Sequence, residues 1–332
     1  MTRFPPAAAL TSRSDPTSGR KMDADTYFAE NYRAARGKFL TACRSLRLLP
    51  QAHRTSAGLG RPDLPLVDSL RLGDPAARHI LVICGGDRQA DALCCSAIAV
   101  GWLNEFANAS LPHDTAILLL HHGAVPAAGG ETVARGNTPP EWEDDLLVKV
   151  EQRYAEYARR KGVDALGKPL AAHELQTVPG YPAAVLDSVA TWLNSAADGR
   201  IAFADIRVGL GPYGEAEISP CHPPDTAAAR RVRSWFGLAD PPQEDAAAPQ
   251  EPDSLSAGLI RRLPQAETTA FSAAFGTYST MSVLDTLATR PEGEAIPDPR
   301  RLLFPTDSAW RTSVWRNAII VIQRALTALH SS

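Results

Sequence analysis

Two charged residues stand at the end of an apolar segment in residues 201–217, IAFADIRVGLGPYGEAE. The first half has the branched and aromatic content of a buried β-strand. Asp205 and Arg207 are two positions apart, so their side chains point to the same face of that strand. Burying charge is costly unless the group is paired or serves a ligand. This segment is therefore the first candidate for a binding site.

The same segment contains the pattern G-x-G-x-x-G at Gly209, Gly211 and Gly214. In a dinucleotide-binding loop a helix begins at the last glycine, and its N-terminus holds the pyrophosphate. Here Pro212 interrupts the loop, and further prolines follow at 220, 223 and 224. We therefore reject nucleotide binding.

Apolar runs predict the strands that must position this segment. Buried strands are expected over 79–84, 115–121, 201–208 and 268–275, with a helix over 90–106. A strand, a helix and a strand in that order predict a parallel pair. The fold class is α/β, a three-layer sandwich with a mixed, mainly parallel sheet. Sites in such folds lie beyond the carboxyl ends of the strands, so we expect convergence after Cys84, His121, Asp205 and Phe275.

The remaining elements are less sharply marked. We expect an edge strand over 64–72 after a loop at 50–62. Expected helices cover 23–46 (capped by Asp23), 142–161, 182–194, 281–289 and 307–329 (capped by Thr306 or Asp307).

The chain is expected to form one domain over 23–330. Residues 1–22 lack a signal-peptide pattern and are expected to be a disordered leader. Residues 239–258, rich in Pro, Ala and acidic residues, are expected to be a low-complexity surface insertion.

Composition narrows the function classes. The chain is 44% apolar and 21% charged with a net charge of −3, which is typical of a globular protein without a basic footprint for nucleic acid. No apolar run approaches the roughly 18 residues needed to span a bilayer. The five cysteines include no C-x-x-C pair. We expect reduced thiols in a cytoplasmic protein, and no structural zinc site.

The segment DIRVGLGPYGE closely resembles DLHTGLGPYGE of a bacterial family of zinc-carboxypeptidase-like proteins of unknown function. Four other segments agree in order. YFAENYRAARGKF resembles the opening helix of that family, and LVICGGDRQADALCCSA resembles LVxSSGTHGVEGFxGSA. AAFGTYSTMSVLDTL is similar to LEFGTYPxxEVLxAL, and FPTDSAWRTSVW also agrees. The resemblance runs from about Tyr27 to the C-terminus and implies a metallocarboxypeptidase fold with one zinc.

At each position to which the resemblance assigns a role, this chain has a different residue. The first zinc His falls on Arg88, the zinc Glu on Asp91 and the second zinc His on Arg207; the general-base Glu falls on Ala274, and the N-R-N segment falls approximately on 140–143. Arginine is always protonated and has no lone pair for a metal. Alanine cannot take a proton from water. Zinc is therefore predicted to be absent, and no catalytic residue is assigned.

A charge comparison suggests what replaces the metal. Arg88, Asp91 and Arg207 together carry a charge of +1, as do zinc and one glutamate. We hypothesise an Arg–Asp–Arg clip across the strands. It is either a pocket for an anion or a structural ion-pair network. Tyr213 and Glu215 are further candidates to contact a ligand, although Glu215 pairing with an arginine is an equal alternative. The candidate ligand-binding residues are Arg88, Asp91, Asp205, Arg207, Tyr213 and Glu215.

The sequence thus favours a catalytically inactive metallocarboxypeptidase-like protein. It would bind a small anionic or peptide-like ligand, or a protein partner such as an active paralogue. The alternative is an active hydrolase, of metallopeptidase or amidohydrolase type, with a rearranged site recruited from His121, Asp87, Asp91 or Glu215. His121 and His122 point to opposite faces of a strand and cannot chelate one metal together. Cys94-Cys95 is interpreted as packing.

Overall fold

The structure, a computed structural model, describes most of a central sheet and the helices on one of its faces. The described residues are 23–54, 66–86, 89–122, 199–240, 266–278 and 304–331, together with Leu193, Arg261 and Leu263.

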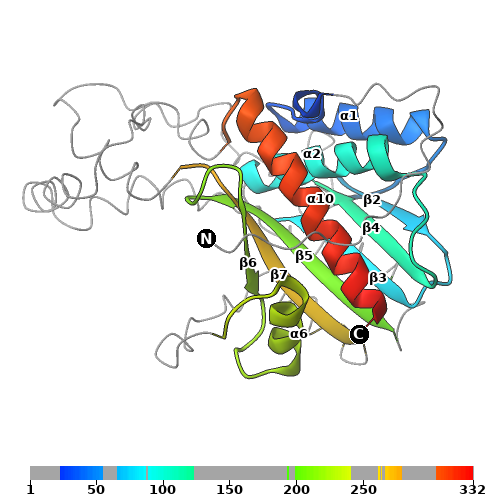
Figure 1. Ribbon diagram of the computed structural model, residues 1–332. Coiled ribbons are helices and arrows are strands. Elements are labelled where there is room, and N and C mark those ends of the chain that lie inside the picture. The colour runs from blue at the N-terminus through cyan, green and yellow to red at the C-terminus, as the bar shows by residue number, and fades with distance from the viewer. Residues whose placement is uncertain are drawn as a thin grey trace, which may run out of the picture.

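The sheet has seven strands in the order β1-β2-β4-β3-β5-β7-β6 (Figure 1). The four central strands run parallel, and the outer pairs β1–β2, β2–β4 and β7–β6 are antiparallel, so the expected mixed sheet is confirmed. The strand bounds are β1 Gln51–Arg54, β2 Leu66–Gly73, β3 His79–Gly85, β4 Thr115–His121, β5 Arg200–Gly209, β6 Ala216–Pro220 and β7 Glu267–Gly276.

Helices pack on one face of this sheet. In Figure 1, α10 crosses in front of the strands, and it lies beside α2 and η1. The bounds are η1 Ala24–Tyr27, α1 Tyr32–Ser45, α2 Gln89–Phe106, α6 Ala227–Phe236 and α10 Ser308–Ser331. Strand side chains alternate between two faces, so Ile206 and Phe275 join the helical core. Ile201, Phe203 and Ala270 form a second cluster on the other face. Of the helices expected over 142–161 and 182–194, only Leu193 is described, and it is helical and packs in that second cluster.

The expected core elements are confirmed with small changes in their bounds. The runs at 79–84, 115–121, 201–208 and 268–275 are β3, β4, β5 and β7, and the helix at 90–106 is α2. Asp307 is the residue that caps the last helix, because its Oδ1 accepts a hydrogen bond from Trp310 N at 2.9 Å.

Two expectations about the periphery were wrong. The helix over 23–46 is two helices, because Asp23 caps the short η1 and Asn31 caps α1 by accepting from Ala34 N at 2.9 Å. β2 is not an edge strand, since β1 arises within the expected loop at 50–62 and pairs with it. Two elements that were not expected, β6 and α6, follow Gly214; the residue after Gly214 leads into a strand and not into a helix. The leader at 1–22, the helix at 281–289 and residues 241–258 of the insertion lie outside the described residues.

Candidate functional site

The carboxyl ends of β3, β5 and β7 meet at one edge of the sheet, as expected for a parallel core. Gly85 pairs with Ile206, and Arg207 pairs with Ala274. The first turn of α2 brings Asp91 to the same edge, where its Oδ1 accepts a hydrogen bond from Val208 N at 2.7 Å. Three of the positions to which the resemblance assigns a role, Asp91, Arg207 and Ala274, therefore converge, whereas the segment 140–143 lies outside the described residues. Arg88 also lies outside the described residues.

Asp205, which strand alternation places on the same face as Arg207, holds the Arg207 guanidinium in position. Its Nε donates to Asp205 Oδ2 at 2.9 Å. The Asp205 side chain is 1% exposed and that of Arg207 is 34% exposed. Burial alone would lower the pKa of Arg207, but the charges of Asp205 and then Asp91 raise it above its usual value, so the guanidinium stays charged. Within the described part of the chain its two Nη groups have no hydrogen-bond partner.

Of the predicted Arg–Asp–Arg clip, the structure describes only Asp91 and Arg207, which form no ion pair with each other; Arg88 is outside the described residues, so the clip stays a prediction. Arg207 is paired with Asp205, whereas Asp91 binds the backbone of β5. Asp91 is 1% exposed and needs the space left by Gly86, because a Cβ there would lie 3.1 Å from Asp91 Cγ. The buried Asp91 thus joins the start of α2 to the end of β5, beyond the last residue of β3. Because β5 extends past the end of β3 at this point, a backbone N–H of β5 is available as the partner of Asp91.

The GLGPYGE loop follows β5 in the chain and is held by hydrogen bonds to β7 and α10. Gly214 N donates to Gly276 O at 2.7 Å, and Gly276 N donates to Glu215 O at 2.9 Å. The carbonyl of Gly214 accepts from Asn317 Nδ2 at 2.8 Å and from Ser313 Oγ at 3.3 Å. Gly214 has φ +68°, which favours glycine. These contacts explain the glycine at position 214 without a bound nucleotide.

Tyr213 and Glu215, the two candidates in this loop, have different environments. The Tyr213 hydroxyl donates to Asp307 Oδ2, the other oxygen of the residue that caps α10. The Tyr213 pKa is raised, first by burial and then by that carboxylate. Glu215 is exposed and forms no ion pair with any described residue, so the alternative of pairing with an arginine is not found. Tyr213 therefore supports the loop.

The sheet register extends the site to a residue that the sequence reasoning missed. Ala274 pairs with Arg207 on one side and with Glu217 of β6 on the other. Glu217 is exposed. The alternation Ala-Glu-Ile-Ser over 216–219 is the signal that predicts such a half-buried strand.

The two adjacent histidines are buried structural groups. His121 lies between Tyr32 and Phe39, with ring centroids 5.6 Å and 5.1 Å away, and its Nδ1 is 3.6 Å from Asp68 Oδ2. It faces α1, on the opposite side of the sheet from Arg207. The ring of His122 lies 3.2 Å from the Gly85 carbonyl oxygen, and burial lowers its pKa to about 3. Among the described residues, no three His, Cys, Asp or Glu side chains form a group that could hold a metal ion.

Four of the five cysteines are buried. All five are free thiols, and Cys94 is fully buried. Burial raises the pKa of Cys94 and Cys95 well above the usual value. The interpretation of these residues as packing is consistent with that burial.

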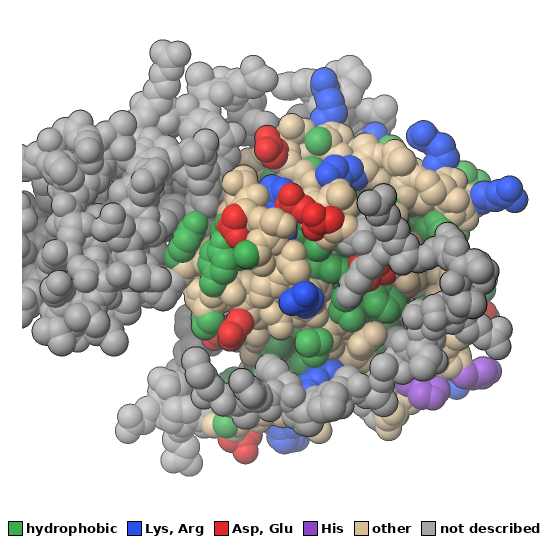
Figure 2. All heavy atoms as spheres, turned by 45° about the horizontal axis from the view of Figure 1, so that its top comes forward, with side chains coloured by type: hydrophobic (Ala, Val, Ile, Leu, Met, Phe, Trp, Pro, Cys, Tyr) green, Lys and Arg blue, Asp and Glu red, His purple; other side chains and the backbone are tan. Residues whose placement is uncertain are grey.

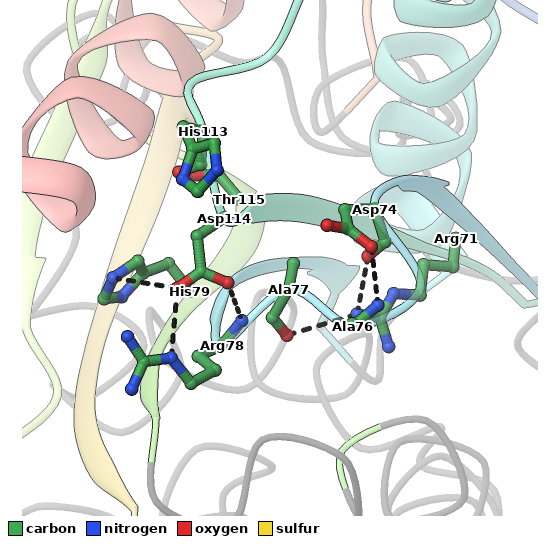
Figure 3. Close-up of polar contacts among 9 residues, drawn as sticks. All are labelled: Arg71, Asp74, Ala76, Ala77, Arg78, His79, His113, Asp114 and Thr115. Atoms are coloured by element: carbon green, nitrogen blue, oxygen red, sulfur yellow. Dashed lines mark hydrogen bonds and ion pairs between the residues drawn. The ribbon is translucent and has the colours of Figure 1, made fainter.

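A cavity of about 420 Å³ lies at the other end of the strands, between the turn before β3 and the loop before β4. Figure 3 shows how its charged residues are used. Asp114 accepts from Arg78 N at 2.8 Å and Arg78 Nε at 3.1 Å, and it lies 3.9 Å from His79 Nε2. Asp74 accepts from Ala76 N at 2.8 Å. These carboxylates hold two turns together, so the edge near Arg207 remains the better candidate.

The surface in Figure 2 carries Asp and Glu side chains among Lys and Arg side chains. No helix in the described ranges is long and apolar enough to cross a membrane.

A family model described as "Protein of unknown function (DUF2817)" matches residues 28–124 and 182–315. The matched ranges contain Asp91, Arg207 and Ala274. No curated protein matches the chain, and no solved structure does.

Proposed function

The chain belongs to the DUF2817 family of proteins of unknown function, and on this premise we propose that it is a catalytically inactive metallocarboxypeptidase-like protein that binds a small carboxylate ligand through Arg207. The three-layer form of that fold, with a second helical layer, is part of the proposal. So is the prediction that the protein holds no zinc.

The observation that carries the proposal is how the Arg207 guanidinium is hydrogen-bonded and exposed. One of its nitrogens, Nε, is engaged by the buried Asp205, which fixes the plane of the group. The two Nη groups have no partner among the described residues and the side chain is one-third exposed. A planar, oriented guanidinium with free Nη groups binds a carboxylate through two parallel hydrogen bonds. The carboxyl edge of a parallel sheet is also where such folds place ligands.

The residues at the converging positions do not suit zinc-dependent hydrolysis. Zinc takes nitrogen, thiolate or carboxylate donors, and Arg207 offers none of these. Ala274, its neighbour across β5 and β7, cannot act as a general base. Asp91 is engaged with the backbone of β5. A hydrolase with a rearranged site would need donors from new positions, and His121 faces the other side of the sheet.

Two measurements test the proposal. Elemental analysis of the purified protein should find no stoichiometric zinc; zinc that is lost in Asp91→Ala would overturn the inactive assignment. Calorimetric titration at low salt should show weak binding of pentanoate. Arg207→Ala should weaken it by about tenfold or more, since hydrogen bonds to charged groups contribute about 1.5–3 kcal/mol.

The controls separate charge from geometry. Arg207→Lys keeps the charge but loses the planar fork, so it should recover only part of the affinity. Arg316→Ala removes an exposed arginine of α10 and should leave binding unchanged. Equal binding by Arg207→Ala and the unchanged chain would refute a role for this residue.

A further inference from the structure

One row of side chains crosses the last three strands at the candidate site. Arg207 of β5 pairs with Ala274 of β7, which pairs with Glu217 of β6. Residues that pair across strands point to the same face of the sheet. The preceding row on that face is Asp205, Ser272 and Ser219.

This part of the face is more accessible than the centre of the sheet. Phe203 and Ala270, which lie on the same face nearer the sheet centre, have no exposure. Arg207, Ala274 and Ser272 are partly exposed, and Glu217 and Ser219 are exposed. We call the set Arg207, Ala274, Ser272, Glu217 and Ser219 the shelf.

The two ends of the shelf carry opposite charges. Strands lie about 4.8 Å apart, so the Cα atoms of Arg207 and Glu217 are roughly 10 Å apart across two strands. Ala274 stands between them and has no side chain that bridges the gap. Arg207 is ion-paired with Asp205 and not with Glu217. Glu217 has no ion-pair partner among the described residues.

We propose that the shelf selects a zwitterion with separated charges, either an unblocked short peptide or an ω-amino acid. Its carboxylate would bind the Nη groups of Arg207, and its ammonium would lie beside Glu217. The hydroxyls of Ser272 and Ser219 can hydrogen-bond a polar spacer. This inference rests on the proposed function and adds a second charge requirement. A dicarboxylate is disfavoured because its second charge would lie beside Glu217.

Three ligands of equal chain length test the charge requirement by titration at low ionic strength. Pentanoate carries only the carboxylate, 5-aminopentanoate adds an ammonium, and glutarate adds a second carboxylate. An exposed charge pair changes affinity by about threefold to fivefold. We expect 5-aminopentanoate to bind that much more tightly than pentanoate, and glutarate to bind more weakly. High salt should reduce both differences.

Variants test whether Glu217 is the residue that recognises the ammonium of the ligand. Glu217→Gln should make pentanoate and 5-aminopentanoate bind alike. Asp225→Asn, which removes an exposed carboxylate between β6 and α6, should leave the preference intact. Arg207→Ala should weaken all three ligands. For a peptide ligand, triglycine should bind more tightly than N-acetyltriglycine; a preference seen only with 5-aminopentanoate assigns the shelf to ω-amino acids.

The outcomes distinguish the two proposals. If pentanoate binds through Arg207 but 5-aminopentanoate binds no more tightly and Glu217→Gln has no effect, the zwitterion inference is overturned and the carboxylate site stands. If no ligand binds, or if binding is independent of Arg207, both are overturned.

Discussion

Gly276 and Gly209 are paired glycines on adjacent strands for which we predict opposite effects of the same substitution. They are register partners at the ends of β7 and β5, and neither has a positive φ. Any difference between their alanine variants must therefore come from the space around each Cβ. At Gly209 a Cβ would meet nothing within 4 Å, whereas at Gly276 it would meet the backbone of the GLGPYGE loop.

The expected cost of Gly276→Ala follows from these contacts. The new Cβ would lie 2.6 Å from Gly211 C and 2.8 Å from Gly211 O, and closer still to the Pro212 carbonyl oxygen. Because these are backbone atoms, no side-chain rotation relieves the overlap, and the loop must move by about 1 Å. Overpacking of this kind costs about 1–3 kcal/mol.

Moving the loop also weakens hydrogen bonds. Gly276 O accepts from Gly214 N at 2.7 Å and from Trp310 Nε1 at 2.8 Å, and each such bond contributes about 1 kcal/mol. We expect a total loss of about 3 kcal/mol. Gly209→Ala should be neutral or stabilising by about 0.5–1 kcal/mol, because alanine restricts the unfolded chain.

The assay is urea unfolding of both variants, followed by tryptophan fluorescence and repeated by thermal denaturation. For a domain of this size a loss of about 3 kcal/mol lowers Tm by roughly 6–12 °C. Equal stability of Gly276→Ala and Gly209→Ala, within about 0.5 kcal/mol, would refute the packing of the loop against β7.

Three further predictions concern buried groups. Burial lowers the pKa of His122 to about 3 and that of His222 to about 4, so between about pH 6.5 and 4 the unfolded chain binds more protons than the folded one. Stability measured by urea unfolding should therefore fall as pH drops through that window, by about 3 kcal/mol for His122 and less for the partly exposed His222; a flat profile would contradict this. Asp91→Ala leaves a backbone N–H of β5 without its acceptor, so it should lower the free energy of unfolding in urea by about 1–3 kcal/mol. Asp91→Asn should cost less, because its amide oxygen still accepts the hydrogen bond. Equal stability of Asp91→Ala and the unchanged chain would argue against this contact. Gly101→Ala places a Cβ 2.8 Å from the Trp315 ring, so thermal unfolding should show a net loss despite the better helix propensity of alanine, and Trp315→Phe in the same chain should cancel part of that loss.

Continuous apolar runs predicted the centre of the sheet correctly. β3, β4, β5 and β7 are buried on both faces, so each needs an unbroken apolar segment that is visible in one sequence. The pairing of Asp205 with Arg207 was also accessible, because residues two apart on a strand share a face. Expectations of this kind depend only on local geometry.

The missed features depend on partners far away in the sequence. β6 is short and half exposed, and it becomes a strand by pairing with β7 about 50 residues later. The place of Glu217 in the site follows from that register and is invisible before the pairing is known. The hydrogen bond from a backbone N–H of β5 to Asp91 was missed for a similar reason, because it joins residues more than 100 positions apart. Local pattern does not show which of several polar groups will meet.

The connection between the GLGPYGE loop and α10 bears on when the site forms during synthesis. Gly214 is held by Ser313 and Asn317, and Tyr213 by Asp307, so the loop takes its shape from residues about 100 positions later. Asp307, Ser313 and Asn317 are synthesised after all of the described strands. The core strands can pair while the chain is still being made, but the loop that follows Arg207 cannot settle until α10 docks. Ligand binding would thus report the last stage of folding, and a nascent chain that stops before α10 would carry the arginine without its finished surroundings.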